Sequence, residues 1–223
     1  IYPMQGVETD KNAHKRRNKG DYKEVPPKLK SRLVGCGNFE NTHGVRTDSP
    51  AGDVDSHNLV FSWCAGKRVR VRSGDITNAY LQGKPLDRII LYRIPRGGIP
   101  EEGVDDGAVF ACRMLIYGTR DAGRHFWLKL EEVIKGQGFK LNYILPTFFT
   151  LRNNEDEIVA VLSSNVGALV YGYLPEAESA VRNILKHFSV HKEETGEFRF
   201  CGKEVVQEDD IGIRVTAKGN TDN

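Results

Sequence analysis

An aspartate at the end of a patterned run is the first candidate for chemistry in this chain. Asp75 follows the alternating residues Arg68-Val-Arg-Val-Arg and precedes Ile-Thr-Asn-Ala-Tyr80. Alternation with period two predicts a strand with one face inward and the other toward something wet or anionic. A carboxylate at a strand end is held rigidly, as metal ligation requires. The same spacing also fits a turn aspartate that caps the next element, and both interpretations stay open.

Charge is distributed unevenly along the 223 residues, although the net charge is only +2. Residues 11–32 hold nine Lys or Arg, a second basic cluster covers residues 67–72, and acidic residues concentrate at 101–106 and 193–210. This asymmetry suits a polyanion that binds one face, and it equally suits solvated surfaces. The length predicts one large domain or two small ones with a real core.

The four cysteines are scattered without paired spacing, which favours free thiols over disulfides or a zinc site. The sequence shows no signal peptide and no apolar run of membrane-spanning length. We therefore expect no membrane partner and an intracellular location, cytoplasmic or nuclear. The first residue is Ile1 and the first methionine is Met4, so we expect a segment of a longer protein.

Strands with three interspersed helices make up the expected fold. Strands are predicted at 30–34, 89–94, 109–115, 147–151, 157–164, 169–171, 198–206 and 211–216, besides the run before Asp75. Helices are predicted after a cap at Asp53 or Asp55, from Thr119 to Gly136, and from Pro175 onward. Short turns join neighbouring strands, so the order predicts an α+β fold with an antiparallel or mixed sheet.

Five motifs in order resemble the reverse-transcriptase domain of copia-type LTR retrotransposons. They begin with Lys30-Ser-Arg32-Leu-Val, the segment around Asp48-Ser-Pro, and Asp75-Ile-Thr-Asn-Ala-Tyr80-Leu-Gln-Gly. They continue with Ile116-Tyr-Gly-Thr-Arg-Asp-Ala-Gly-Arg-His-Phe-Trp and end with Phe198-Arg-Phe-Cys-Gly-Lys-Glu-Val. The motifs cover nearly the whole chain.

The resemblance implies a polymerase with fingers and a palm, the palm built on a ferredoxin-like antiparallel or mixed sheet packed on helices. Residues 1–66 would form an N-terminal extension and a fingers-like part, residues 67–192 the palm, and residues 193–223 the palm end or the start of a thumb or connection. The implied reaction is attack of a primer hydroxyl on the α-phosphate of a deoxynucleotide, with two Mg²⁺ ions neutralising charge.

In the family, three aspartates hold these ions. Asp75 matches the first, with the Ile76 carbonyl as a further ligand, but Gly167 and Ala168 stand where the paired aspartates belong. Two carboxylates are therefore missing, and we predict a catalytically inactive copy. The motif Val104-Asp-Asp does not replace them, because it precedes the Tyr117-Gly motif and lies in an acidic, turn-prone loop.

Several nucleotide-binding positions of the family are kept. Lys30 and Arg32 match residues that grip the triphosphate, or they form a solvated edge strand. Tyr80 matches the aromatic residue under the sugar, a role that is compatible with core packing.

The template–primer positions are Gly118, Arg120 and Arg124, whereas Asp121 and Gly123 replace the family's Gln and Pro. The implied partners are an RNA or DNA template–primer and a deoxynucleotide, with the basic clusters on the nucleic-acid backbone. The resemblance also implies a Pol polyprotein whose integrase and RNase H would lie outside this chain. Alternatives are a non-catalytic nucleic-acid-binding module and a degenerate fragment without function.

Overall fold

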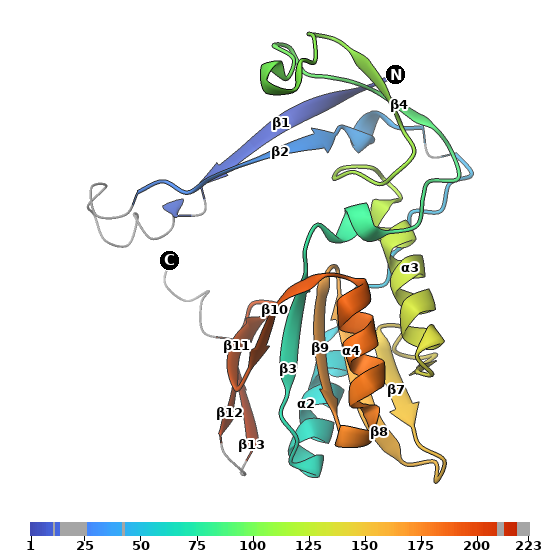
Figure 1. Cartoon of the computed structure of the whole chain (residues 1–223), viewed down its shortest axis with the longest axis vertical. Coiled ribbons are helices and arrows are strands. Elements are labelled where there is room, and N and C mark those ends of the chain that lie inside the picture. Colours follow the sequence, from blue (N-terminus) through green and yellow to red (C-terminus); the bar gives the residue numbers. More distant parts are fainter. Residues whose placement is uncertain (11, 14–25, 42, 209–211, 218–223) are drawn as a thin grey trace. The chain divides into compact units, whose positions relative to one another are not determined.

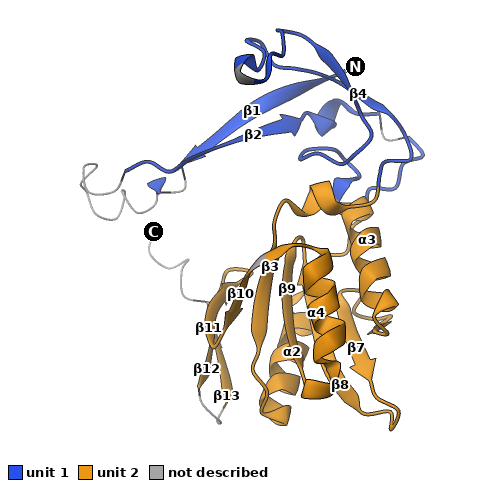
Figure 2. Ribbon diagram, in the orientation of Figure 1, with its two compact units in different colours: residues 1–47, 85–122 blue, residues 48–84, 123–223 orange. Residues whose placement is uncertain are grey.

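The computed structural model describes residues 1–10, 12–13, 26–41, 43–208 and 212–217. The chain divides into two compact units, each made of two separate stretches of sequence (Figure 2). Unit 1 contains residues 1–47 and 85–122, and unit 2 contains residues 48–84 and 123–223. The resemblance implies boundaries after residues 66 and 192, between the fingers-like part, the palm and the C-terminal part, and these boundaries stay a prediction. Among the described residues, no helix is both long and apolar enough to cross a bilayer.

Unit 1 is built on a four-stranded sheet of order β2-β1-β4-β5 (Figure 1). The strands are β1 (Tyr2–Asp10), β2 (Leu29–Gly35), β4 (Ile90–Arg93) and β5 (Val109–Cys112), with the short 3-10 helices η1 (Gly37–Phe39) and η3 (Pro100–Glu102). β1 pairs antiparallel with β2 and parallel with β4. The sequence predicted β2 correctly but only loose, extended structure before it. Most residues of β1 are exposed, so no buried alternation marks this strand in the sequence.

Unit 2 is built on a six-stranded sheet of order β10-β3-β9-β8-β7-β6. The strands are β3 (Arg72–Ile76), β6 (Lys140–Leu141), β7 (Phe148–Arg152), β8 (Ile158–Asn165), β9 (Ala168–Tyr173) and β10 (Val190–Thr195). Helix α3 (Ala122–Gly136) precedes β6, while η4 (Pro175–Ala177) and α4 (Glu178–His187) connect β9 to β10. The four neighbouring strands β10-β3-β9-β8 follow the chain order β3-α3-β8-β9-α4-β10.

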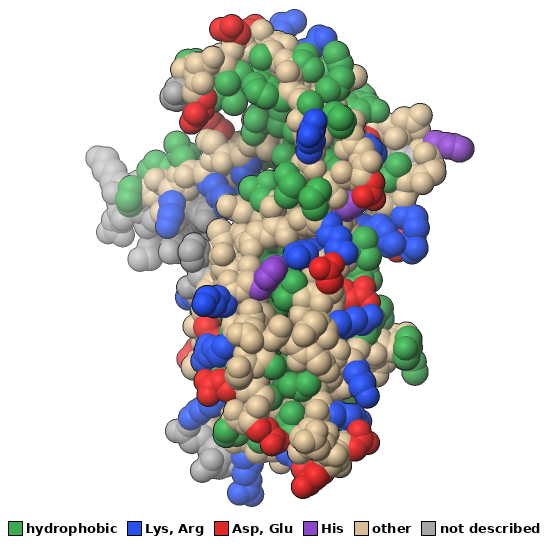
Figure 3. Space-filling view, turned by 45° about the vertical axis from the view of Figure 1, so that its right-hand side comes forward, with side chains coloured by type: hydrophobic (Ala, Val, Ile, Leu, Met, Phe, Trp, Pro, Cys, Tyr) green, Lys and Arg blue, Asp and Glu red, His purple; other side chains and the backbone are tan. Residues whose placement is uncertain are grey.

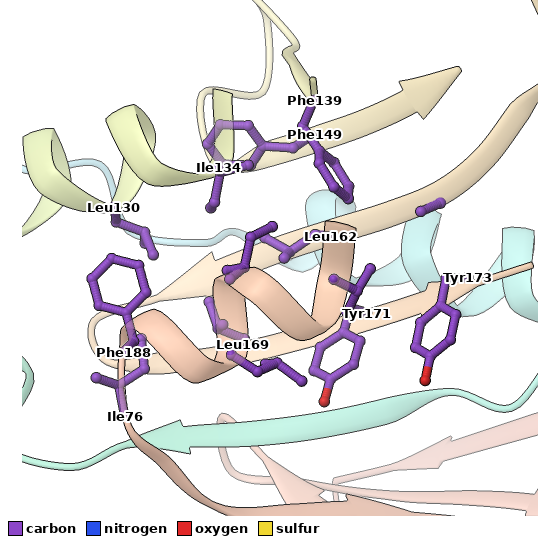
Figure 4. Close-up of a cluster of buried hydrophobic side chains, with 14 of the residues drawn as sticks. Ile76, Leu130, Ile134, Phe139, Phe149, Leu162, Leu169, Tyr171, Tyr173 and Phe188 are labelled. Atoms are coloured by element: carbon purple, nitrogen blue, oxygen red, sulfur yellow. The ribbon is translucent and has the colours of Figure 1, made fainter. Parts of the chain in front are cut away.

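Each face of this sheet has its own core, because successive strand residues point to opposite sides. Leu162 of β8 and Leu169 and Tyr171 of β9 pack with α3 and α4 on one face (Figure 4). Val161 and Val170, their neighbours, pack on the other face against α2 (Val54–Lys67) and the small sheet β11-β12-β13. The strands that carry the predicted site are thus buried on both sides.

The helices follow the sequence prediction closely. The Asp53 carboxylate accepts a hydrogen bond from the Ser56 amide at 2.7 Å, which confirms it as the cap of α2. One face of α2 is buried and the other is exposed: Val60 and Cys64 lie in the core, and Leu59 faces solvent. A local hydrogen bond therefore fixes the start of α2, and packing against the core fixes which of its faces is buried.

Several strand predictions need correction, and strand β10 was not predicted. The segment predicted as one strand at 198–206 is a hairpin of β11 (Glu197–Phe200) and β12 (Lys203–Glu208), because Cys201 and Gly202 both adopt positive φ. β13 (Gly212–Thr216) adds to β12. The strand before Asp75 begins at Arg72 rather than at Arg68, whose left-handed backbone ends α2. β10 had no sequence signal; its charged residues pair with β3 through the backbone.

Candidate functional site

The end of β3 and the β8–β9 turn lie side by side in unit 2. β3 is hydrogen-bonded between β9 and β10, so that Asp75 stands opposite Ala168 on one side and Lys192 on the other. The Ile76 amide donates a hydrogen bond to the Gly167 carbonyl at 2.6 Å. Positions 75, 167 and 168, which lie far apart in the sequence, are therefore adjacent in the structure.

Gly167 occupies the tightest point of this turn. Its φ is +86°, and a Cβ on it would stand 2.9 Å from the Ala79 Cβ and 3.8 Å from the Ile76 carbonyl oxygen. A left-handed conformation and a close neighbour both favour glycine here. The Ile76 side chain itself is buried in the core, while the Asp75 side chain is exposed. The turn thus packs its backbone against residues 76–79 and leaves the carboxylate of Asp75 at the surface.

The donor set at this point does not fit a pair of magnesium ions. Such ions require several carboxylate oxygens directed at one spot. The turn residues Asn165, Val166, Gly167 and Ala168 carry no carboxylate. Over the part of the chain that the structure describes, no group of three His, Cys, Asp or Glu side chains could hold a metal ion. Asp75 alone cannot replace the hydration shells of two ions, so no catalytic step is derived through them.

Tyr80 and Arg124 also belong to unit 2 and have structural contacts. Tyr80 lies in η2 (Ala79–Gln82) and packs edge-on against Phe126 of α3, with ring centroids 6.4 Å apart. Arg124 of α3 forms an ion pair of 2.8 Å with Asp48. Tyr80 therefore connects the segment after β3 to α3, and Arg124 connects α3 to the segment before α2. Arg72, in the second basic cluster, lies over the Tyr173 ring at 4.4 Å.

Lys30, Arg32, Gly118 and Arg120 belong to unit 1. The Gly35 amide donates to the Tyr117 carbonyl at 2.8 Å, and the Arg32 guanidinium lies 5.2 Å from the centre of the Tyr117 ring. Gly118 has φ +89°, and a Cβ on it would meet the Gly35 carbonyl oxygen at 2.0 Å. This contact between β2 and the 116–120 loop brings Arg32 and the loop together. Most of the 11–32 basic cluster, residues 11 and 14–25, lies outside the described residues.

Asp121 has a role that sequence reasoning missed. It is buried, and its carboxylate accepts hydrogen bonds from Arg88 at 3.1 and 3.4 Å. Arg88 also binds Glu40 at 3.1 Å, and the Glu40 carboxylate accepts a hydrogen bond from the buried Tyr92 hydroxyl. The sequence marked Asp121 only as a departure from the family's Gln. Its side chain is buried in unit 1, where it pairs with Arg88.

Burial and charge together shift the pKa values in this network. Burial lowers the pKa of Arg88, but its hydrogen bond to Glu40 and the charge of Asp121 outweigh that effect and raise it above the ordinary value. Burial and the hydrogen bond to Glu40 raise the pKa of Tyr92. Arg88 therefore stays charged and Tyr92 stays protonated, as their hydrogen bonds require.

His57, on the buried side of α2 in unit 2, is a second group without a sequence signal. Its Nε2 has no hydrogen-bond partner among the described residues, and its ring packs edge-on against Phe200 at 4.8 Å. Burial, followed by the positive charge of Lys203, lowers the pKa of His57 below 6.5, while Asp53 opposes the shift. The ring is therefore held neutral in the core.

Comparison with known proteins gives evidence on the origin of the chain. No protein-family model matches the sequence. Over 151 residues, 66% of this chain, the sequence is 28% identical to the "Retrovirus-related Pol polyprotein from transposon TNT 1-94" of tobacco, Nicotiana tabacum. The match supports an origin in a copia-type retrotransposon Pol polyprotein. The aligned part spans only 11% of that polyprotein's own length.

Proposed function

We propose that the chain is a reverse-transcriptase domain of a copia-type retrotransposon that keeps the polymerase scaffold and has lost catalysis. One observation carries this proposal: Asp75 is paired with Ala168, so the position beside the remaining aspartate holds a methyl group instead of a carboxylate. In the family that the sequence resembles, phosphoryl transfer depends on charge neutralisation by metal ions at this point. With one carboxylate, neither the attacking hydroxyl nor the leaving pyrophosphate is neutralised.

A fingers–palm fold belongs to the same proposal. Unit 2 would be the palm, and its support is the strand order β10-β3-β9-β8 with α3 and α4 on one face, which is the split βαβ arrangement of ferredoxin-like sheets. Unit 1, with its long β1–β2 hairpin, would correspond to the fingers. The proposal assigns Lys30 and Arg32 to the triphosphate and Tyr80 to the sugar.

Primer extension tests the proposal. The unaltered chain and the double variant Gly167→Asp, Ala168→Asp are compared on a primed RNA template with magnesium or manganese. We expect no extension by the unaltered chain, and extension by the double variant if the scaffold is otherwise intact. The matched control is Gly167→Asn, Ala168→Asn, which has the same size and backbone preference but cannot ligate metal as an anion.

Extension by the unaltered chain would refute the loss of catalysis. Since a Cβ at position 167 would press on Ala79, the folding of both double variants is checked by thermal unfolding. If they fold and the aspartate variant still fails, the scaffold has lost more than the two carboxylates, and the polymerase part of the proposal is wrong for this copy.

A non-catalytic nucleic-acid-binding module is the second candidate. It is favoured by the exposed cations Arg32 and Arg120, which flank the contact between Gly35 and Tyr117 in unit 1. Binding of a primer–template whose affinity falls steeply with salt, and weakens in an Arg32→Gln, Arg120→Gln variant, would support it. Binding that is absent at low salt would leave only a fragment without this function.

A further inference from the structure

The β11–β12 hairpin belongs to the small sheet of unit 2 and not to the six-stranded sheet (Figure 1). At its base, the Gln207 backbone amide donates to the Gly196 carbonyl at 2.7 Å. The Gln207 side chain also bonds the Val69 carbonyl and the Val71 amide, at 2.8 and 2.9 Å. The tip of the hairpin, residues 200–203, lies at the opposite end. Hydrogen bonds to the backbone therefore fix the base, and the tip depends on other contacts.

Side-chain contacts with Asn165 and His57 hold the tip. The Asn165 amide, in the β8–β9 turn, donates to the Cys201 sulfur at 2.8 Å, and a thiol sulfur is a weak acceptor. The buried Phe200 ring packs edge-on against His57 of α2, with ring centroids 4.8 Å apart and ring planes at 85°. The inner side of the tip therefore lies directly on a titratable ring.

The surroundings of His57 suit a neutral ring. His57 is 3% exposed, and its Nε2 has no hydrogen-bond partner among the described residues. A Cβ on Gly52 would stand 2.5 Å from this Nε2 and 2.5 Å from the Ser164 carbonyl oxygen, so the Gly52 backbone closes this side of the ring. Protonation puts an N–H on both ring nitrogens, and the one at Nε2 would be buried without an acceptor.

The charges that act on His57 come from both sides of its contact with the tip. Lys203, on the hairpin, is second only to burial in lowering the pKa of His57. Asp53, the cap of α2, opposes the shift and has the smallest of the three effects. The other neighbours, the Gly52 backbone and the Ser164 carbonyl, bring no charge. A protonated His57 would therefore repel the tip, and Asp53 would compensate only in part.

We propose that the β11–β12 hairpin is a pH-sensitive flap whose tip separates from α2 when His57 takes up a proton. Separation of the tip gives the imidazolium access to water and moves Lys203 away from it, while the base of the hairpin stays attached. Because Cys201 contacts Asn165, the same movement removes a contact of the β8–β9 turn beside Asp75. The proposal does not depend on catalysis or on nucleic-acid binding.

The pH window of this change is specific to histidine. Lys, Arg, Asp and Glu side chains are interspersed on the surface of unit 2, in the lower part of Figure 3. Carboxylates ordinarily titrate near about pH 4 and amines above about pH 10, whereas histidine titrates near about pH 6.5. A change between about pH 6.5 and about pH 5.5 therefore reports a histidine. The exposed His187 of α4 provides a matched control for the buried His57.

Hydrogen exchange of the backbone amides, read by mass spectrometry, tests the flap in the unaltered chain. After correction for the intrinsic exchange rate, we expect the protection of residues 198–206 to fall about fivefold between about pH 6.5 and about pH 5.5, because opening of the tip takes up one proton. Low concentrations of urea should not change this exchange, since a local opening exposes little surface. Exchange of β3, β8 and β9 should increase with urea, because their amides open with the whole unit.

Histidine variants identify the group that responds. His57→Gln should remove the pH dependence of hairpin exchange, whereas His187→Gln should keep the fivefold fall. Lys203→Gln should make the fall smaller, because the charge that opposes protonation of His57 is gone. If His57→Gln fails to fold, the unaltered chain decides, since urea separates opening of the hairpin from unfolding of the unit. The proposal is overturned if hairpin protection does not change with pH, if His57→Gln keeps the fall, or if the hairpin opens only together with β3, β8 and β9.

Discussion

Replacement of Arg88 by methionine should destabilise unit 1, because Arg88 is the cation that binds two buried carboxylates. The Arg88 side chain is 27% exposed, but the side chains of the carboxylates that it binds, Glu40 and Asp121, are only 0% and 3% exposed. Methionine fills the space of the aliphatic stem and leaves both anions buried without their cation. Breaking a buried pair from one side costs about 3 to 5 kcal/mol.

The partial exposure of Arg88 places the expected loss at the lower end, about 3 kcal/mol in the free energy of unfolding. Small domains are stable by only about 5 to 15 kcal/mol, so the open fraction of unit 1 should rise by about two orders of magnitude. Tryptophan fluorescence does not report this change directly, because Trp63 and Trp127 both belong to unit 2. The assay is therefore hydrogen exchange of the β4 and β5 amides, read by mass spectrometry.

Two further variants separate the charge effect from lost packing. The triple variant Arg88→Met, Glu40→Gln, Asp121→Asn removes the buried charges and should recover most of the lost stability. Arg93→Met removes an exposed arginine of β4 and should change exchange by little. If Arg88→Met costs less than about 1 kcal/mol, or if the triple variant is no better, the cluster is not a buried ion-pair network and the placement of Asp121 is wrong.

Three more predictions concern single positions. Because the pKa of His57 is lowered in the folded state, the unfolded chain binds more protons below pH 6.5. The free energy of unfolding should therefore fall as the pH drops from 6.5 toward the folded pKa. In the variant His57→Gln, the urea midpoint should depend less on pH over this window. Gly118→Ala should lower the free energy of unfolding by about 3 kcal/mol, because the added Cβ meets a carbonyl oxygen. Gly44→Ala, which has a similar φ but open space around it, should lower it by about 1 kcal/mol in the same thermal unfolding assay. Equal losses would contradict the contact between Gly118 and Gly35. Asp53→Ala should lower stability by about 1 kcal/mol and Asp53→Asn by much less, as measured by chemical denaturation; no difference between them would exclude the cap.

Local patterns in the sequence were sufficient for the helices and for most central strands. The Asp53 cap, the glycines that end α3, and the turn between β7 and β8 each act within a few residues, so they are visible without a tertiary structure. The sequence also predicted that Val104-Asp-Asp lies in a loop, whereas the turn at 165–168 joins two strands. That Gly167 and Ala168 carry no carboxylate is likewise a property of the sequence itself.

Contacts between segments far apart in the sequence decided the remaining strands and the surroundings of the polar site residues. β1 and β10 pair through their backbones with strands far away in the sequence, and the β1 sequence has no buried alternation that would reveal the strand. Asp121 and His57 look like ordinary polar residues until packing buries them. Asp75 could be a cap or a metal ligand by its spacing; the pairing of β3 with β9 places it beside Ala168, because strand register is set by the whole sheet and not by the residues around the aspartate.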